Sequence, residues 1–357
     1  LPQLTEESDY GGSGNYGLMD CIKGVQWIID NIAAFGGDPE NITLMGQSGG
    51  SSKVTGVLVS PLMEGKIART INQSYLNAFS TYPTQEEAEQ AGLDYLEQLG
   101  LDADISVEEL RAMDAETLYS VQGQYLIHLD GKYFTQNPVD FYLKEGNLNN
   151  IDMLFGNVFG EAASGMQIPG AEQPTIPQTA EEFYNAVRAV YGDELCDKYA
   201  LEENFPVTDW TVGAQYVVFS NLEGLASNRV FAAIKDKLDP ESNTFIYTFG
   251  RVTPGDEIGW HSGELWYTFG SLRRETAGYR DWQRWDYAAA DITTTYWSNF
   301  IKTGDPNGEG VPTWPSADDM SYQFIDWNCI SYDASSPIDQ MIIEHYITTN
   351  NLGEYFA

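Results

Sequence analysis

Ser48 stands in a short glycine-rich stretch with the spacing of a catalytic nucleophile. The stretch is Gly46-Gln47-Ser48-Gly49-Gly50, which fits the pattern G-x-S-x-G. In proteins that use this pattern, the serine occupies a sharp turn between a strand and a helix, and its hydroxyl attacks a carbonyl carbon. Such a turn needs residues without Cβ on both sides of the serine, and the glycines supply them. The stretch therefore predicts that Ser48 is a nucleophile for acyl transfer.

Three histidines, His128, His261 and His345, are candidates for the base that such a serine needs. A serine hydroxyl attacks only when a base takes its proton and an acid fixes the tautomer of that base. His345 falls in a predicted amphipathic helix, and His128 has no glycine turn beside it to free its ring. His261 lies between Gly259 and Gly263, after a predicted strand and loop. We therefore predict that His261 is the base.

The elements around Ser48 indicate whether it is catalytic, because the G-x-S-x-G pattern also occurs by chance. Before it, residues 42–45 form a short apolar run of the kind found in buried parallel strands. After it, residues 49–59 predict a helix whose N-terminus directs free N–H groups and the positive end of its dipole at the developing charge. An amphipathic helix at residues 17–34 precedes both. Together these elements form a unit that places Ser48 at the end of a strand.

Strand and helix patterns alternate along the rest of the chain. Further strands are expected at residues 67–73, 153–157, 243–249 and 322–325. Further helices are expected at residues 84–99, 106–113, 115–124, 180–191, 210–237, 279–303 and 338–348, and exposed loops at residues 1–14 and 167–178. Strands separated by helices, without hairpin signals, predict a parallel sheet covered on both faces.

The region around the serine resembles the type-B carboxylesterase family, which includes cholinesterases and bacterial para-nitrobenzyl esterases. The segments that carry the resemblance are Asn15–Asp20, Gln26–Ile28, Asn31–Pro39 and the stretch around Ser48 itself. The resemblance implies an α/β-hydrolase fold, with a mostly parallel sheet flanked by helices. It also implies a serine hydrolase that needs no metal and no organic cofactor.

The same resemblance points to the base and to its acid partner. Gly259–Leu265 looks like the histidine motif of the family, which agrees with His261 as the base. Composition alone does not choose among 53 acidic residues, and Asp152 precedes a predicted strand and so faces the wrong end of the sheet. Phe155–Ala162 resembles the family's strand-Gly-x-x-x-x-Glu segment, which puts the acid at Glu161. The order serine, acid, histidine is that of α/β-hydrolases.

A polar network behind the three catalytic candidates is also implied by the resemblance. The family has a serine at the end of the next strand and an acid three residues after the histidine, and Ser74 and Glu264 occupy these positions here. One position departs from the family, which usually has Glu before the nucleophile where this chain has Gln47. Without that negative charge the imidazolium of His261 is less stabilised, so we predict a more acidic histidine than the family norm.

Only part of an oxyanion hole can be found in the sequence. The backbone N–H of Gly49 can supply one donor to the tetrahedral oxyanion. The family takes the others from a glycine-rich His-Gly-Gly loop, and neither that loop nor the family's first strands occur in residues 1–47. We therefore expect residues 1–357 to be the C-terminal portion of a single α/β-hydrolase domain, with helical insertions at about 80–125 and 165–237. The N-terminal portion is expected to accompany it as a separate or nicked chain, unless the sequence is truncated.

The charge of the chain excludes some classes of partner. With 53 acidic and 18 basic residues the formal charge is −35 and the pI about 4.1, so phosphate backbones repel it and nucleic-acid binding is not expected. No apolar run approaches the 18 residues of a membrane span.

Three cysteines, far apart and odd in number, predict neither a disulfide framework nor a zinc cluster. We expect reduced thiols and a cytoplasmic protein, with secretion as the alternative.

The function expected from these residues is hydrolysis of carboxylic esters through an acyl-enzyme on Ser48. Aromatic residues near the base suit apolar or aryl esters, namely Trp260, Trp266, Tyr267 and Phe269. A first alternative is a catalytically silent binding or adhesion protein, since the family includes neuroligins, which lack the serine nucleophile. A second alternative is a hydrolase with the same three residues that acts on amides, thioesters or carbamates. The sequence does not separate this second alternative from an esterase.

Overall fold

The computed structural model describes residues 1–121, 123, 127–148, 150–161, 175–272 and 280–356. The chain divides into two compact units. The first comprises residues 1–42, 52–68 and 77–147, and the second residues 43–51, 69–76 and 148–357. The prediction of a single domain with two helical insertions stays a prediction, although helices do occur in both of the expected ranges.

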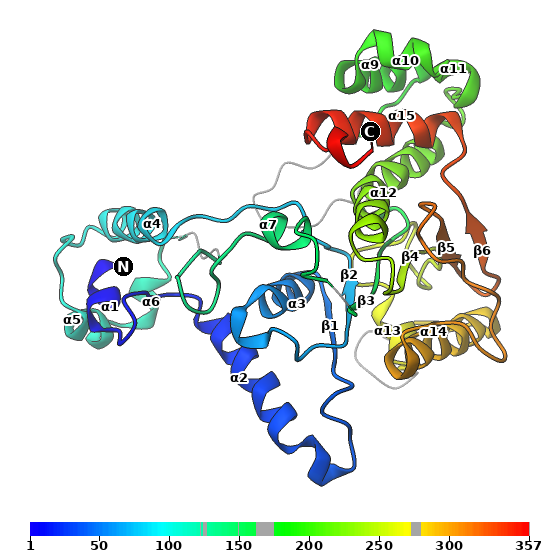
Figure 1. Cartoon of the computed structure of the whole chain (residues 1–357). Helices are drawn as coiled ribbons and strands as arrows, with labels where there is room; N and C mark the ends of the chain where they lie inside the picture. Colours follow the sequence, from blue (N-terminus) through cyan, green and yellow to red (C-terminus); the bar gives the residue numbers. More distant parts are fainter. Residues whose placement is uncertain (122, 124–126, 149, 162–174, 273–279, 357) are drawn as a thin grey trace. The chain divides into compact units, whose positions relative to one another are not determined.

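A six-stranded sheet forms the centre of the second unit (Figure 1). Its strands are β1 (Thr43–Gln47), β2 (Arg69–Gln73), β3 (Asp152–Val158), β4 (Thr244–Phe249), β5 (Tyr322–Ile325) and β6 (Ile330–Tyr332). They lie side by side in sequence order, and the first five are parallel. The predicted α/β class with a mostly parallel sheet is therefore confirmed.

The last strand, β6, was not predicted, and the expectation that the sheet has no hairpin was wrong. β6 pairs antiparallel with β5, and the rings of Tyr322 and Tyr332 stack across this pair with centroids 5.3 Å apart. All three residues of β6 are exposed. A strand that is so short and buries no side chain leaves no alternating pattern of apolar residues in the sequence.

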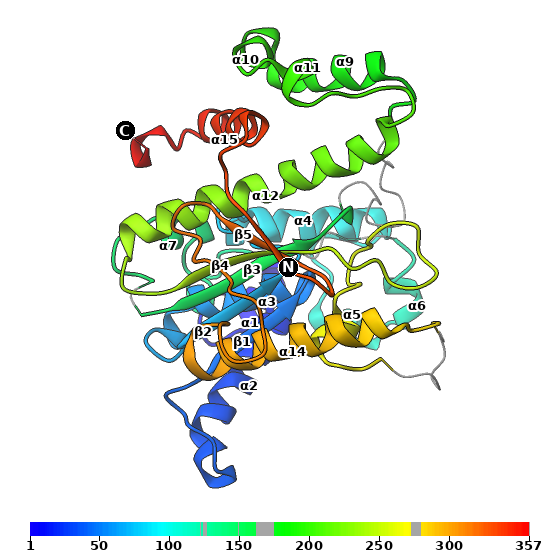
Figure 2. The same ribbon diagram turned by 90° about the vertical axis from the view of Figure 1, so that its right-hand side faces the viewer.

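Helices cover both faces of this sheet (Figure 2). Helix α12 (Val212–Leu238) lies on one face, and α13 (Leu265–Thr268) and α14 (Arg284–Thr303) lie on the other. Successive side chains of a strand point to opposite faces. Accordingly Phe155 of β3 contacts Phe231 of α12, while Tyr247 of β4 contacts Trp297 of α14, with ring centroids 5.6 Å and 5.2 Å apart. Both faces of the central strands β3 and β4 are therefore buried, as the apolar strands predicted.

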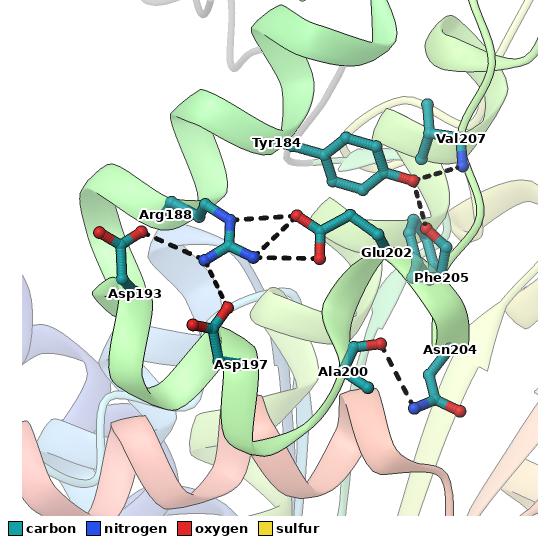
Figure 3. A network of polar contacts seen from close by, with 9 residues as sticks. All are labelled: Tyr184, Arg188, Asp193, Asp197, Ala200, Glu202, Asn204, Phe205 and Val207. Carbon is teal, nitrogen blue, oxygen red and sulfur yellow. Dashed lines mark hydrogen bonds and ion pairs between the residues drawn. The ribbon is translucent and has the colours of Figure 1, made fainter.

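A second layer of helices packs on the outer side of α12. It consists of α9 (Ala180–Tyr191), α10 (Asp193–Lys198), α11 (Leu201–Asn204) and α15 (Pro337–Thr349). Figure 3 shows how Arg188 of α9 joins the three short helices, because its guanidinium pairs with Asp193 and Asp197 of α10 and with Glu202 of α11. This cluster is structural: it connects helices that are too short to be stable alone.

The first unit is mainly helical. Its elements are α1 (Pro2–Glu7), α2 (Tyr16–Asn31), η1 (Ile32–Phe35), η2 (Pro61–Met63), α4 (Gln85–Gln98), α5 (Val107–Ala112), α6 (Ala115–Leu118) and α7 (Pro138–Tyr142). Helix α3 (Gly49–Val59) has residues in both units. Thr84 and Ser106 begin α4 and α5 with capping boxes, which explains why these helices start where the sequence predicted.

Some predicted boundaries were wrong. Residues 1–14 contain α1 and are not a simple loop, and α6 ends at Leu118 rather than at residue 124. Helix α14 starts at Arg284 rather than at residue 279, because Gln283 and Asp286 form its capping box. Residues 167–174 of the expected loop lie outside the described residues. None of the described helices is long and apolar enough to cross a membrane.

Candidate active site

The candidate residues follow the ends of successive parallel strands. Ser48 follows β1, Ser74 follows β2, Glu161 follows β3, and His261 lies in the loop after β4. Adjacent parallel strands end at the same edge of a sheet, and this edge is where α/β proteins place their ligands. All of these residues belong to the second unit.

Ser48 occupies a strained turn between β1 and α3. Its φ is 55°, in the left-handed region that residues other than glycine rarely adopt, and its N–H donates to the carbonyl of Gln73 at 2.9 Å. A Cβ on Gly46 would overlap the backbone of Gly50, so glycine is required at position 46. A Cβ on Gly49 or on Gly50 would meet only open space, so the expectation that all three glycines are needed was wrong. The turn has the geometry of a nucleophile elbow.

His261 and Glu161 meet through their side chains. Nδ1 of His261 bonds to Oε1 of Glu161, and Oε2 of Glu161 accepts from the backbone N–H of Val158 at 3.0 Å. The two side chains are only 20% and 13% exposed. The carboxylate is thereby held in place on its own loop, and it faces the imidazole of the next loop.

Two glycines let these loops approach each other. A Cβ on Gly259 would overlap the carbonyl oxygen of Phe159, and Gly160 has a φ of 84°. The backbone before His261 therefore packs directly against the backbone before Glu161. This contact explains how residues 100 positions apart come together.

The bond to Glu161 raises the pKa of His261 above its ordinary value, while burial of the ring acts in the opposite direction. When His261 is neutral, a proton on Nδ1 donates to Glu161 and Nε2 is left as an acceptor. The amide nitrogen of Gln47 lies 3.3 Å from this Nε2. Within the described part of the chain, no hydrogen bond joins the Ser48 hydroxyl to His261. The structure thus brings the predicted base and the predicted acid together, with Gln47 against the ring.

A buried polar group lies behind the pair. Glu264 is completely buried, and its Oε1 accepts from Nε2 of Gln73 at 3.2 Å. The same amide lies 3.4 Å from the Thr268 hydroxyl oxygen. Burial raises the pKa of Glu264 to about 7, and the charge of Glu161 adds to this rise. Gln73 was not predicted from the sequence, although it is the last residue of β2.

The side chain of Ser74 does not take part in this network among the described residues, contrary to the expectation. Its backbone N–H donates to the carbonyl of Gly156 at 2.7 Å, and its φ is 51°. Its hydroxyl is buried without a hydrogen-bond partner among the described residues. The bond to Glu264 is made by Gln73 instead. Gln73 of β2 pairs with Gly156 of β3, which pairs with Tyr247 of β4, so the side chains of Gln73 and Tyr247 lie on the same face of the sheet.

The predicted aromatic cluster is only partly near the base. The rings of Trp260 and Trp266 lie 5.5 Å apart beside the His261 loop. Tyr267 is completely buried, and its hydroxyl donates to Asp286 at 3.0 Å, while Phe269 is 67% exposed. The single turn of α13 directs Tyr267 into the core. The residue type alone did not distinguish this buried tyrosine from one that lines the site.

The other predicted residues have the following places. Gly49 is the first residue of α3, where backbone N–H groups have no acceptor within the helix, so it can donate to an oxyanion. His128 is buried, with Nε2 2.8 Å from the carbonyl oxygen of Ser13, and the ring of His345 packs 4.5 Å from that of Tyr191. Among the residues that the structure describes, no three His, Cys, Asp or Glu side chains are arranged to hold a metal ion.

Comparison with known proteins relates this geometry to a family. The model described as "Carboxylesterase family" matches residues 5–333. Bile salt-activated lipase of Homo sapiens is 28% identical over 342 residues, which cover 84% of this chain and 43% of that protein. Neuroligin-2 of Rattus norvegicus is also 28% identical, over 84% of this chain and 39% of its own length. The chain thus spans less than half of the length of these two curated relatives.

Solved structures show the same fold. A PNB esterase covers 94% of this chain and 70% of its own, with a TM-score of 0.67 and 21% sequence identity. A thermophilic PNB esterase covers 94% and 69%, with a TM-score of 0.67 and 22% identity. The predicted α/β-hydrolase fold is therefore confirmed.

Proposed function

The chain belongs to the carboxylesterase family, and on that premise we propose that the protein hydrolyses carboxylic esters through an acyl-enzyme on Ser48. The observation that carries the proposal is the bond between His261 and Glu161 at the sheet edge where Ser48 forms its strained turn. A serine in an elbow beside an imidazole–carboxylate pair is the arrangement used for acyl transfer.

The reaction would proceed in two halves. His261 Nε2 takes the proton of the Ser48 hydroxyl, Ser48 Oγ bonds to the ester carbonyl carbon, and the N–H of Gly49 donates to the oxyanion. His261 then gives its proton to the departing alcohol as the C–O bond breaks. A water that loses its proton to His261 hydrolyses the acyl-enzyme in the same way. Because the Gln47 amide lies 3.3 Å from Nε2, it must move aside before Ser48 can bond there.

Apolar or aryl esters are the proposed substrate class. Trp260 and Trp266 form an aromatic pair on the loop and helix that flank His261. Both side chains are partly exposed, so they can contact a substrate that approaches the base. The alternatives from the sequence remain amides, thioesters and carbamates, which would use the same three residues.

A catalytically silent binding protein is the second candidate, because neuroligin-2 matches this chain at the same 28% identity as the lipase. Binding alone does not require a strained serine and a bonded imidazole–carboxylate pair at the same edge of the sheet. The presence of Ser48, Glu161 and His261 therefore favours hydrolysis.

A nitrophenyl ester assay tests the proposal. Replacement of the nucleophile in Ser48→Ala should lower kcat by at least about 10³-fold, because enzymes of this type depend on it almost completely. Ser52→Ala, one helical turn later on α3, is the matched control and should stay within about twofold of the wild type. Equal activity in the two variants would refute Ser48 as nucleophile. A wild-type protein that turns over no ester of any chain length would instead favour the binding function.

A further inference from the structure

The loop that carries His261 has little structure of its own. It runs from Gly250, directly after β4, to Glu264, directly before α13, and it contains neither helix nor strand. Its internal backbone bonds are confined to two turns, from Asp256 to Thr253 and from Gly263 to Trp260. The position of His261 must therefore depend on contacts with other parts of the second unit.

The first end of this loop is held by an ion pair. Arg251 bonds to the completely buried carboxylate of Asp286 on α14, at 2.6 Å, and approaches Asp326 at 3.9 Å. The segment just before His261 is held by the close packing of Gly259 against Phe159. The part of the loop between these two points needs a third attachment.

That attachment is Arg280, which lies outside the loop in the sequence. Nη1 of Arg280 donates to the carbonyl of Pro254 and to Oδ2 of Asp256, both at 2.7 Å. The same guanidinium stacks on Trp266 of α13, with 4.9 Å to the ring centroid, and lies 5.9 Å from the ring of Trp260. One cation thus contacts residues 254 and 256 of the loop, the residue next to His261, and helix α13.

A further bond inside the loop transmits this attachment to the base. The indole N–H of Trp260 donates to the hydroxyl of Thr253 at 3.0 Å, and Thr253 is almost completely buried. Residues 253–256, which Arg280 holds at Pro254 and Asp256, are therefore bonded to the residue directly before His261. A shift of this segment would move Trp260, and with it the imidazole.

We propose that Arg280 is a positioning residue for His261, which holds the loop so that the imidazole stays against Glu161. Arginine suits this place because Nη1 carries two hydrogens, one for each of the two oxygens, while the planar face of the guanidinium stacks on indole rings. None of these contacts of Arg280 involves His261 itself, so Arg280 would act through Pro254, Asp256 and the two tryptophans. The inference rests on the proposed function and extends it to a residue 19 positions beyond the base.

Kinetics of three variants test this role. Arg280→Ala should lower kcat about 10- to 100-fold with KM within about threefold, since misplacement of a catalytic group by about 1 Å can cost 10²-fold. Arg280→Lys keeps the charge next to Asp256 but loses the planar face. Its kcat should therefore lie between those of the wild type and of Arg280→Ala. Arg284→Ala is the matched control. It removes the same charge and a cation stacked 5.5 Å over Trp285, and should leave kcat unchanged.

Nitrogen-15 NMR of the histidines separates this inference from the proposed function. The Nδ1 proton of His261, identified by its loss in His261→Gln, should give a downfield signal that weakens in Arg280→Ala and not in Arg284→Ala. Unchanged kcat and an unchanged signal in both Arg280 variants would overturn the inference while ester hydrolysis stands. A wild type without esterase activity would overturn the proposed function, and the NMR comparison would still decide the role of Arg280. If Arg280→Ala does not fold, Arg280→Lys decides by the same two measurements.

Discussion

At the scale of single residues, the surroundings of His261 determine how its charge depends on pH. Glu161 bonds to Nδ1 and raises the pKa of His261, while the buried Glu264 also lies close enough to stabilise the imidazolium. Gln47 is neutral and contacts the other ring nitrogen. In the proposed mechanism His261 must be unprotonated to accept the Ser48 proton, so each of these groups should move the acidic limb of the rate profile.

Replacement of the neutral amide in Gln47→Glu should raise the pKa of His261 further, because a carboxylate at the same distance stabilises the imidazolium. The base would then stay protonated up to a higher pH. The acidic limb of the kcat/KM profile should accordingly move to higher pH, by about one unit, which corresponds to about 1.4 kcal/mol. The measurement is kcat/KM for a nitrophenyl ester between about pH 5 and pH 9.

The control for this variant is Gln98→Glu, which adds the same charge at an exposed position at the end of α4. Its profile should match that of the wild type. If the kcat/KM profile of Gln47→Glu also matches that of the wild type, the replacement of the family's Glu by Gln47 does not lower the pKa of His261.

At the scale of elements, the two loops that bear Glu161 and His261 are positioned by backbone contact as well as by side chains. Gly259 leaves no space for a Cβ next to Phe159, and Gly160 adopts a left-handed conformation. A loop that is shifted to make room for one carbon atom would draw the imidazole away from the carboxylate. The two glycines thus help to fix the geometry of the proposed catalytic pair without taking part in the chemistry.

The change Gly259→Ala should therefore lower kcat by about 10²-fold or more, since the new Cβ would overlap a backbone oxygen that cannot rotate away. Nitrophenyl ester turnover under saturating substrate is the measurement. Gly213→Ala, in the first turn of α12, is the control. It has open space around a Cβ and should be neutral or slightly stabilising. Equal activity in both variants would show that the contact between the loops is dispensable.

At the scale of the whole molecule, segments that are distant in the sequence hold the second unit together. The guanidinium of Arg229 on α12 bonds to Asp339 at the start of α15, and both side chains are almost completely buried. Arg229 also donates to the carbonyl of Asp333 and stacks 4.9 Å over Tyr322. All catalytic candidates lie in this unit, so the proposed activity depends on its stability.

Removal of the cation in Arg229→Ala should lower the free energy of unfolding by about 3–5 kcal/mol, because Asp339 is left as an uncompensated buried charge. Urea unfolding followed by tryptophan fluorescence measures the change. Arg111→Ala breaks an exposed pair with Glu7, whose side chains are 62% and 50% exposed, and should not shift the transition measurably. Indistinguishable transitions for the two variants would contradict the importance of the buried pair.

The sequence by itself determined the local features of this protein. The elbow around Ser48, the helix that follows it and the helix Ala180–Tyr191 could be read from short patterns, because turns, caps and amphipathic faces depend on neighbouring residues. Glu161 was found among 53 acidic residues only through a family resemblance. Strand β6 and helix α1 were missed, since neither buries a side chain that would leave a pattern.

Only the tertiary structure decided which distant residues meet. It placed Gln73 rather than Ser74 on Glu264, turned Tyr267 into the core, and attached Arg280 to the loop of the base. It also joined the loops of Glu161 and His261 through Gly160 and Gly259. Such contacts depend on the register of parallel strands and on the packing of loops that are a hundred residues apart, and no local pattern in the chain encodes them.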